Sequence, residues 1–166
     1  MRTDELLAAA FDNIEGVVTR AVDGLTVDQL AQAPAPGANT IGWLVWHLTR
    51  VQDDHVAEVA GTEQVYTAQG FAQRFALPFD DRETGYGMDV EDVARLRAEA
   101  VTLLDYHRAV HAAADSYLRT LSDGDLDRVV DEQWDPPVTL GVRLVSVVTD
   151  DLQHAGQAAY VRGLVT

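Results

Sequence analysis

The chain has 166 residues, a formal net charge of −15 and 47% hydrophobic residues, which predicts one globular domain, residues 1–166. The acidic balance argues against nucleic acid and anionic membranes as partners, and no apolar run reaches the length of a membrane span, so we expect a cytoplasmic protein. Because the chain has no cysteine, disulfides and thiolate metal ligands are excluded, and thiol chemistry requires a thiol from outside the chain.

Four long amphipathic helices are predicted from apolar residues that recur at helical spacing. In chain order they cover about Thr3–Val22, Thr40–Ala60, Asp89–Leu121 and Leu140–Leu164. Thr40 is a good N-cap for the second helix, and Gly61 is expected to end it. Helices of this length predict an all-α fold, an antiparallel four-helix bundle in which one long crossover connection is allowed.

The long connection 62–89 separates the second and third predicted helices. Loops of this length are often functional lids, although a packed structural loop is an equal alternative. Its aromatic side chains and two tryptophans elsewhere are candidates for the wall of a pocket, with core packing as the alternative for most. They are Phe71, Phe75, Phe79, Tyr86, Trp43 and Trp134.

His47 lies within WLVWHLTRVQDDH, residues 43–55, in the second predicted helix. At about 100° per residue it lies roughly 60° to one side of the cluster formed by Leu44, Leu48, Val51 and His55, at the shoulder of the buried face. Asp54 and Glu58 lie farther round the helix. By itself this position suits either a core histidine with a hydrogen-bond partner or a metal ligand.

Asp150 and His154 stand four residues apart in the last predicted helix, so both side chains project from one face and can bind one ion. Val147 shares that face, which places the pair toward the core. A buried carboxylate is costly unless it is paired or bound to a metal, so this pair and His47 predict a cation site. The alternative is a buried Asp–His hydrogen bond that stabilises the bundle. Gly156 costs about 1 kcal/mol in a helix relative to alanine, which indicates a close neighbour such as another helix or a ligand.

A rival histidine pair, His107 and His111, is also spaced by four residues, in the third predicted helix. It lacks a carboxylate on its stripe, because Asp115 is displaced to one side. Either histidine is a candidate for an additional ligand or a supporting hydrogen bond. We expect His55 to be an ordinary core or groove histidine.

Trp43 and Arg143 are the candidates for contact with a cofactor. Arg143 shares the ligand face of the last helix, three turns before His154 and so roughly 16 Å away. It would bind an anionic group at the mouth of a pocket, or it is a solvated charge near the end of the helix.

These residues resemble the pattern of the DinB-like superfamily, whose metal-binding four-helix bundles include the N-terminal domain of mycothiol-dependent maleylpyruvate isomerase. The family combines a histidine in helix two, in a W/G-x-x-x-H-L context, with a carboxylate or histidine in the last helix, followed four residues later by a histidine and GQ. Here IGWLVWHL supplies His47, and DDLQHAGQ supplies Asp150 and His154. Many members have histidine in place of Asp150 and the isomerase has glutamate, so this chain keeps a carboxylate on a shorter side chain.

The resemblance implies a divalent metal, zinc or nickel, held by His47, Asp150 and His154, and a homodimer. For some members it also implies transfer or isomerisation with a low-molecular-weight thiol such as mycothiol. Two histidines and one carboxylate leave coordination positions open, as in catalytic sites. We therefore expect a metal-dependent thiol S-transferase or isomerase, with a small-molecule thiol and a small electrophile as partners. The alternatives are a metal-dependent hydrolase, with Asp54 or Glu58 as general base, and a non-catalytic, stress-associated metal-binding bundle.

Overall fold

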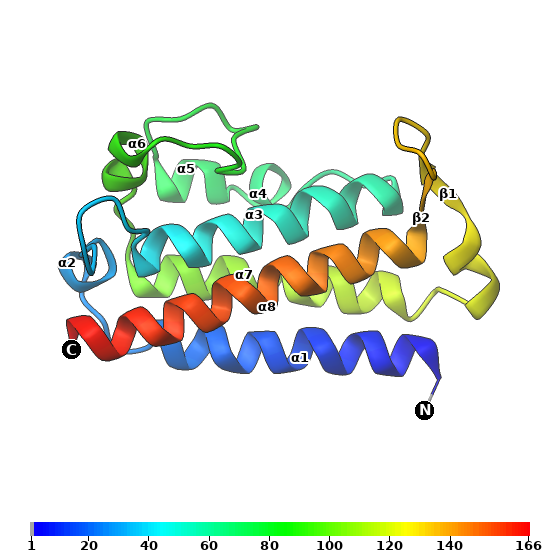
Figure 1. The fold of residues 1–166 in the computed structure, drawn as a ribbon, viewed down its shortest axis with the longest axis horizontal. Helices are drawn as coiled ribbons and strands as arrows, with labels where there is room; N and C mark the ends of the chain where they lie inside the picture. The colour runs from blue at the N-terminus through cyan, green and yellow to red at the C-terminus, as the bar shows by residue number, and fades with distance from the viewer. Residues whose placement is uncertain (1) are drawn as a thin grey trace.

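Four long helices form a bundle in the computed structural model, which describes residues 2–166 (Figure 1). They are α1 (Thr3–Val22), α3 (Ile41–Ala60), α7 (Ala100–Leu118) and α8 (Leu140–Val165). The predicted all-α four-helix bundle is confirmed. The N-cap at Thr40 is also confirmed, because its hydroxyl accepts a hydrogen bond from the Trp43 amide, and Gly61 ends α3 with a φ of 68°.

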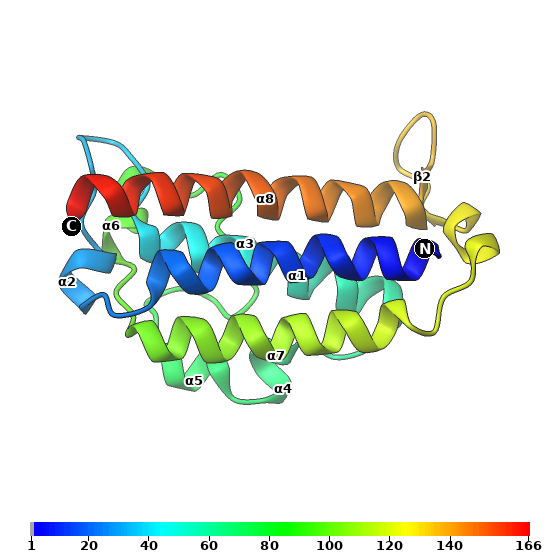
Figure 2. The ribbon, with the colours of Figure 1, turned by 90° about the horizontal axis from the view of Figure 1, so that it is seen from below.

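The bundle places α8 and α7 on opposite sides of the diagonal pair α1 and α3, and both pack against each of that pair. In Figure 1, α1 and α8 run from right to left, whereas α3 and α7 run from left to right. Figure 2 shows α1 between α8 and α7. The neighbours α3 and α8 are therefore antiparallel, as predicted, while α3 and α7 run the same way because the connection between them crosses back along the bundle.

Shorter elements lie in the connections. They are α2 (Val27–Leu30), α4 (Val65–Ala68), α5 (Phe71–Phe75), α6 (Val90–Arg95), the 3-10 helix η1 (Asp123–Asp127), β1 (Val129–Asp131) and β2 (Val138–Thr139). The two strands form an antiparallel hairpin in which Val129 is opposite Thr139. Within the described residues, no helix combines the length and the apolar character needed to cross a membrane.

The third predicted helix, Asp89–Leu121, is wrong as one continuous element. Asp89 does cap a helix there, but α6 ends at Arg95, Leu96 adopts an extended conformation with ψ of 108°, and α7 begins only at Ala100. Leu96 is nevertheless 1% exposed. Because the buried residues Val93, Leu96 and Leu103 keep roughly helical spacing across the break, the apolar pattern continues where the backbone hydrogen bonds do not.

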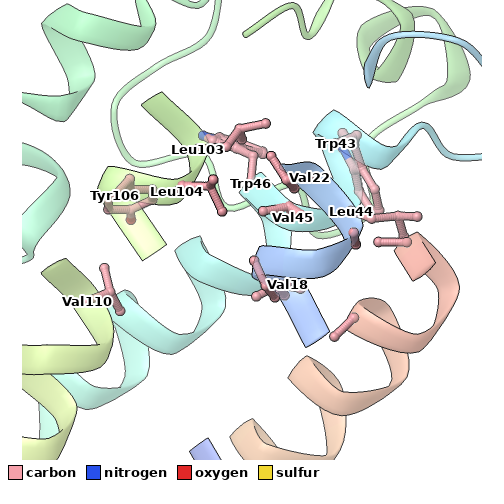
Figure 3. Packing of buried hydrophobic residues seen from close by; sticks show 14 of the residues in the cluster. Val18, Val22, Trp43, Leu44, Val45, Trp46, Leu103, Leu104, Tyr106 and Val110 are labelled. Carbon is pink, nitrogen blue, oxygen red and sulfur yellow. The ribbon is translucent and has the colours of Figure 1, made fainter. Parts of the chain in front are cut away.

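The core is assembled mainly around α3 (Figure 3). Figure 3 shows Val45 and Trp46 of α3 with residues of α1 and α7 around them. The bundle covers one side of α3, and the crossover connection covers the other (Figure 1). Five polar side chains of α3 are consequently buried: His47, Thr49, Arg50, Gln52 and Asp53. His47, at 5% exposure, lies inside the protein rather than at the shoulder of a buried face.

Candidate metal centre

His47 from α3 meets Asp150 and His154 from α8, and one potential ligand atom of each lies within 4.8 Å of the other two. The antiparallel packing of α3 on α8 produces this convergence, because Asp150 and His154 are one turn apart on the face that meets α3. The ring centroids of His47 and His154 are 4.9 Å apart. In the described part of the chain, no other group of three or more histidine and acidic side chains meets these distances.

Both histidines use Nδ1 for a hydrogen bond to an oxygen that can only accept. His47 Nδ1 donates to the carbonyl oxygen of Thr84 at 2.5 Å, and His154 Nδ1 donates to Gln157 Oε1 at 2.9 Å. A neutral imidazole protonated at Nδ1 keeps its Nε2 lone pair free, which is the usual state of a metal-ligating histidine. The two hydrogen bonds therefore fix the tautomer in which each Nε2 can bind a cation.

Asp150 supplies a carboxylate that is not fully satisfied by protein groups. Its Oδ1 lies 3.6 Å from His154 Nε2, and its Oδ2 is buried with no hydrogen-bond partner among the described residues. Leaving a carboxylate oxygen buried and unpaired is costly, and a bound cation would remove that cost. Two imidazole nitrogens and a carboxylate form a donor set that suits zinc or nickel. Ligand atoms around zinc lie about 3.4 Å apart, so binding would draw the three side chains together.

The indole ring of Trp43 packs against the imidazole ring of His47. The two rings stack with centroids 4.6 Å apart and an interplanar angle of 17°, and Trp43 Nε1 donates to the sulfur of Met88 at 3.3 Å. Burial lowers the pKa of His47, which favours the neutral, ligating form. The structure therefore places Trp43 against a candidate ligand, where it restricts the orientation of the ring.

The loop that carries Thr84 is held on α3 by Arg50. This guanidinium is fully buried and donates to the carbonyl oxygens of Asp81 and Glu83 at 2.9 and 3.0 Å, directly before the Thr84 carbonyl that binds His47. Gly85 follows with a φ of 92°, and a Cβ there would lie 2.9 Å from His47 Nδ1. Only glycine fits both the backbone conformation and this close approach.

A cavity of about 460 Å³ opens beside the three candidate ligands. His47 and Asp150 line it, with the aliphatic side chains of Val51 and Val147 next to them on α3 and α8. A ligand pocket for a small molecule typically has a volume of about 300–1,000 Å³. The site therefore has room for an exogenous molecule next to the ligand atoms.

Asp54 and His55 also line this cavity. They follow His47 by about two helical turns, so they lie roughly 10–12 Å farther along α3. Burial, and secondarily the charge of Arg143, lowers the pKa of His55. Asp54 therefore lies in the same cavity as the candidate ligands, but about two helical turns from His47 along α3. Glu58 is 64% exposed, and its carboxylate is 4.0 Å from His55 Nδ1.

The rival histidines do not converge on a common point. His107 is buried and its Nδ1 lies 3.1 Å from the hydroxyl of Thr49 on α3, whereas His111 Nε2 lies 3.0 Å from Asp12 on α1. Arg143 is not a solvated charge, and its Nε is buried without a hydrogen-bond partner among the described residues. Its side chain is 17% exposed and forms an ion pair with Asp131 of β1 at 3.0 Å.

Two groups that support the site escaped the sequence analysis. Thr84 contributes a backbone carbonyl from an irregular loop, and no side-chain pattern signals such a group. Gln157 belongs to the GQ motif, and its position three residues after His154 on one helix predicts the contact. Of the aromatic candidates for a pocket wall, Phe71 and Phe75 are buried in the core and Phe79 packs against it. Tyr86 of the loop and Trp134 of the β1–β2 hairpin line the cavity.

A family model for the DinB superfamily matches residues 10–158. A conserved protein from Enterococcus faecalis superposes with a TM-score of 0.92 and 32% sequence identity, covering 99% of this chain and 98% of that one. YfiT from Bacillus subtilis, described as a probable metal-dependent hydrolase with an unusual four-helix bundle topology, has a TM-score of 0.61 at 18% identity and covers 95% and 85% of the two chains. No curated protein is significantly similar in sequence.

Proposed function

Because the chain belongs to the DinB superfamily, we propose that it is a divalent-metal-dependent enzyme that adds a small nucleophile to a small electrophile. The observation that carries the proposal is the convergence of His47, Asp150 and His154 beside an open cavity. A bound ion would lower the pKa of a coordinated water or thiol toward neutrality. The chain would hold the ion through two Nε2 atoms and a carboxylate, with Thr84 and Gln157 fixing the rings.

Two nucleophiles fit this proposal, and each has its own support. A low-molecular-weight thiol such as mycothiol fits the family resemblance and the lack of cysteine in the chain, and it would make the protein an S-transferase or isomerase. Water fits the description of YfiT as a probable metal-dependent hydrolase. A thiol S-transferase would turn over a bimane electrophile only when the thiol is added, whereas a hydrolase would cleave an activated ester in thiol-free buffer.

Metal content is the first test of the proposal. Protein loaded with zinc or nickel and then desalted should retain one ion per chain by mass spectrometry, and His154→Ala should lower the affinity by at least about 100-fold, because it removes a direct ligand. His111→Ala is the matched control, since that histidine faces Asp12 instead. Substoichiometric metal in the wild type, or equal loss in both variants, would contradict the proposal.

The outer face of α8 supports a second proposal, that two copies of the chain associate there. Every exposed residue of α8 is uncharged, although the chain carries a net charge of −15. Large apolar side chains that are more than half exposed follow this face: Val142, Val145, Leu152, Tyr160 and Leu164. Gly156 lies on the same face, and nothing within the described chain lies within 4 Å of a Cβ built there. The neighbour that this glycine predicts would then belong to a second copy.

A further inference from the structure

Two exposed aromatic side chains line the cavity beside the candidate ligands. Tyr86 is 89% exposed and Trp134 is 67% exposed, and both belong to the cavity wall. They come from different segments, the loop before α6 and the tip of the β1–β2 hairpin. Aromatic rings left in water at the wall of a cavity are typical of ligand sites, because a bound molecule recovers the free energy of burying them.

The wall of the same cavity is aliphatic next to the candidate ligands. Val51 follows His47 by one turn of α3, and Val147 precedes Asp150 by three residues on α8. A molecule coordinated through one end would therefore place its next atoms against these side chains. The polar groups of the site are concentrated at the ligands and at the far end, near Asp54.

The charge of the cavity wall disfavours an anionic substrate. Among the described residues that line it, none is an arginine. Arg143, whose charge reaches His55, is paired with Asp131. An anionic group away from the ion would gain no cationic partner and would face the carboxylate of Asp54.

We propose that the site takes a small, uncharged molecule with a planar aromatic group, and that this group packs against the cavity wall formed by Tyr86 and Trp134 while a coordinating end lies at His47, Asp150 and His154. The position of the coordinating end rests on the metal-dependent function proposed above. The position of the aromatic group rests only on Tyr86, Trp134 and the cavity, so the metal site and the aromatic site can be tested separately.

Hydroxamates test the proposal because their coordinating end is constant while the attached group varies. Zinc-loaded protein should bind benzohydroxamate about tenfold more tightly than acetohydroxamate, a difference of about 1.4 kcal/mol. Trp134→Ala and Tyr86→Ala should each reduce this ratio to below about threefold without changing the affinity for acetohydroxamate. Dissociation constants from isothermal titration calorimetry provide the measurement.

Tyr160→Ala is the matched control, because Tyr160 is 71% exposed on α8 and does not line the cavity. It should leave the ratio of the two affinities unchanged. Cyclohexanecarbohydroxamate separates a planar group from a merely apolar one. Equal binding of the cyclohexyl and phenyl compounds, or a ratio that survives both aromatic substitutions, would overturn the proposal.

Benzamide tests the aromatic group without a metal. In zinc-free protein it should shift the indole N–H resonance of Trp134, identified by its loss in Trp134→Phe. If zinc fails to bind and this resonance still shifts, the proposed metal function is wrong and the aromatic site stands. If the resonance shifts neither with benzamide nor with benzohydroxamate in zinc-loaded protein, the aromatic site is overturned.

Discussion

His107 shows how one buried side chain makes the stability of the fold depend on pH. Thr49 Oγ1 donates to the carbonyl of Val45 at 2.7 Å, so it accepts from His107 Nδ1. Nε2 of His107 is buried without a partner among the described residues. Burial lowers the pKa of His107 from 6.5 to about 3. The unfolded chain therefore binds a proton that the folded chain excludes.

This exclusion predicts a loss of stability in acid. The free energy of unfolding is unaffected by His107 above 6.5, the pKa of this histidine in the unfolded chain. It decreases as the pH falls from 6.5 toward 3, because the unfolded chain then binds a proton that the folded chain does not. Between pH 7 and pH 4 the wild type should lose on the order of 3 kcal/mol more unfolding free energy than His107→Leu does. Urea denaturation of both proteins in the presence of a chelator measures the difference. His111→Leu, one turn farther on, controls for adding a leucine to α7. The same pH dependence in wild type and His107→Leu would contradict the assignment.

At the scale of elements, Arg50 connects the crossover loop to α3 and so to the candidate metal centre. Arg50→Met should lower the unfolding free energy by about 3 kcal/mol, because it leaves the carbonyls of Asp81 and Glu83 without their buried partner. It should also weaken zinc binding, since the Thr84 carbonyl would no longer be held against His47. Urea denaturation and a competitive zinc titration measure the two effects.

The control for this variant is Arg74→Met. Arg74 is 43% exposed and pairs with Asp105 on the surface, so its loss should cost less than about 1 kcal/mol. Faster hydrogen exchange of the amides in residues 81–85 should accompany Arg50→Met alone. Unchanged zinc affinity in Arg50→Met would show that the loop does not position His47.

Sequence periodicity predicts the long helices because each buries an apolar face and carries recognisable end signals, such as Thr40 and Gly61. It also places Asp150 and His154 on one face of the last helix, since residues four apart share a face. The approach of His47 to this pair follows from the packing of α3 on α8. Periodicity does not reveal the break before Ala100, because apolar spacing persists through an extended segment. The pairing of Arg143 with Asp131 depends on a short hairpin that has no strong strand pattern. The hydrogen bond from His47 to Thr84 depends on a backbone group that every residue carries.

At the scale of the whole molecule, the uncharged outer face of α8 predicts self-association. Leu152→Glu should convert a dimer into a monomer in light scattering across a concentration series, because it places two charges in an apolar contact between strongly acidic molecules. Val101→Glu on α7 is the matched control, because both side chains are 54% exposed. A wild type that remains monomeric throughout, or dissociation in both variants, would contradict the dimer proposal.

The helix α8 carries Asp150 and His154 on its inner side and the uncharged residues Leu152 and Gly156 on its outer side. Both Asp150 and His154 lie on this one helix. A shift or rotation of α8 against a second copy would move both side chains together and change their distances from His47, and so the geometry around a bound ion. If two copies associate through the outer side, as proposed, ion occupancy on one side of α8 and assembly on the other would be mechanically coupled through this helix.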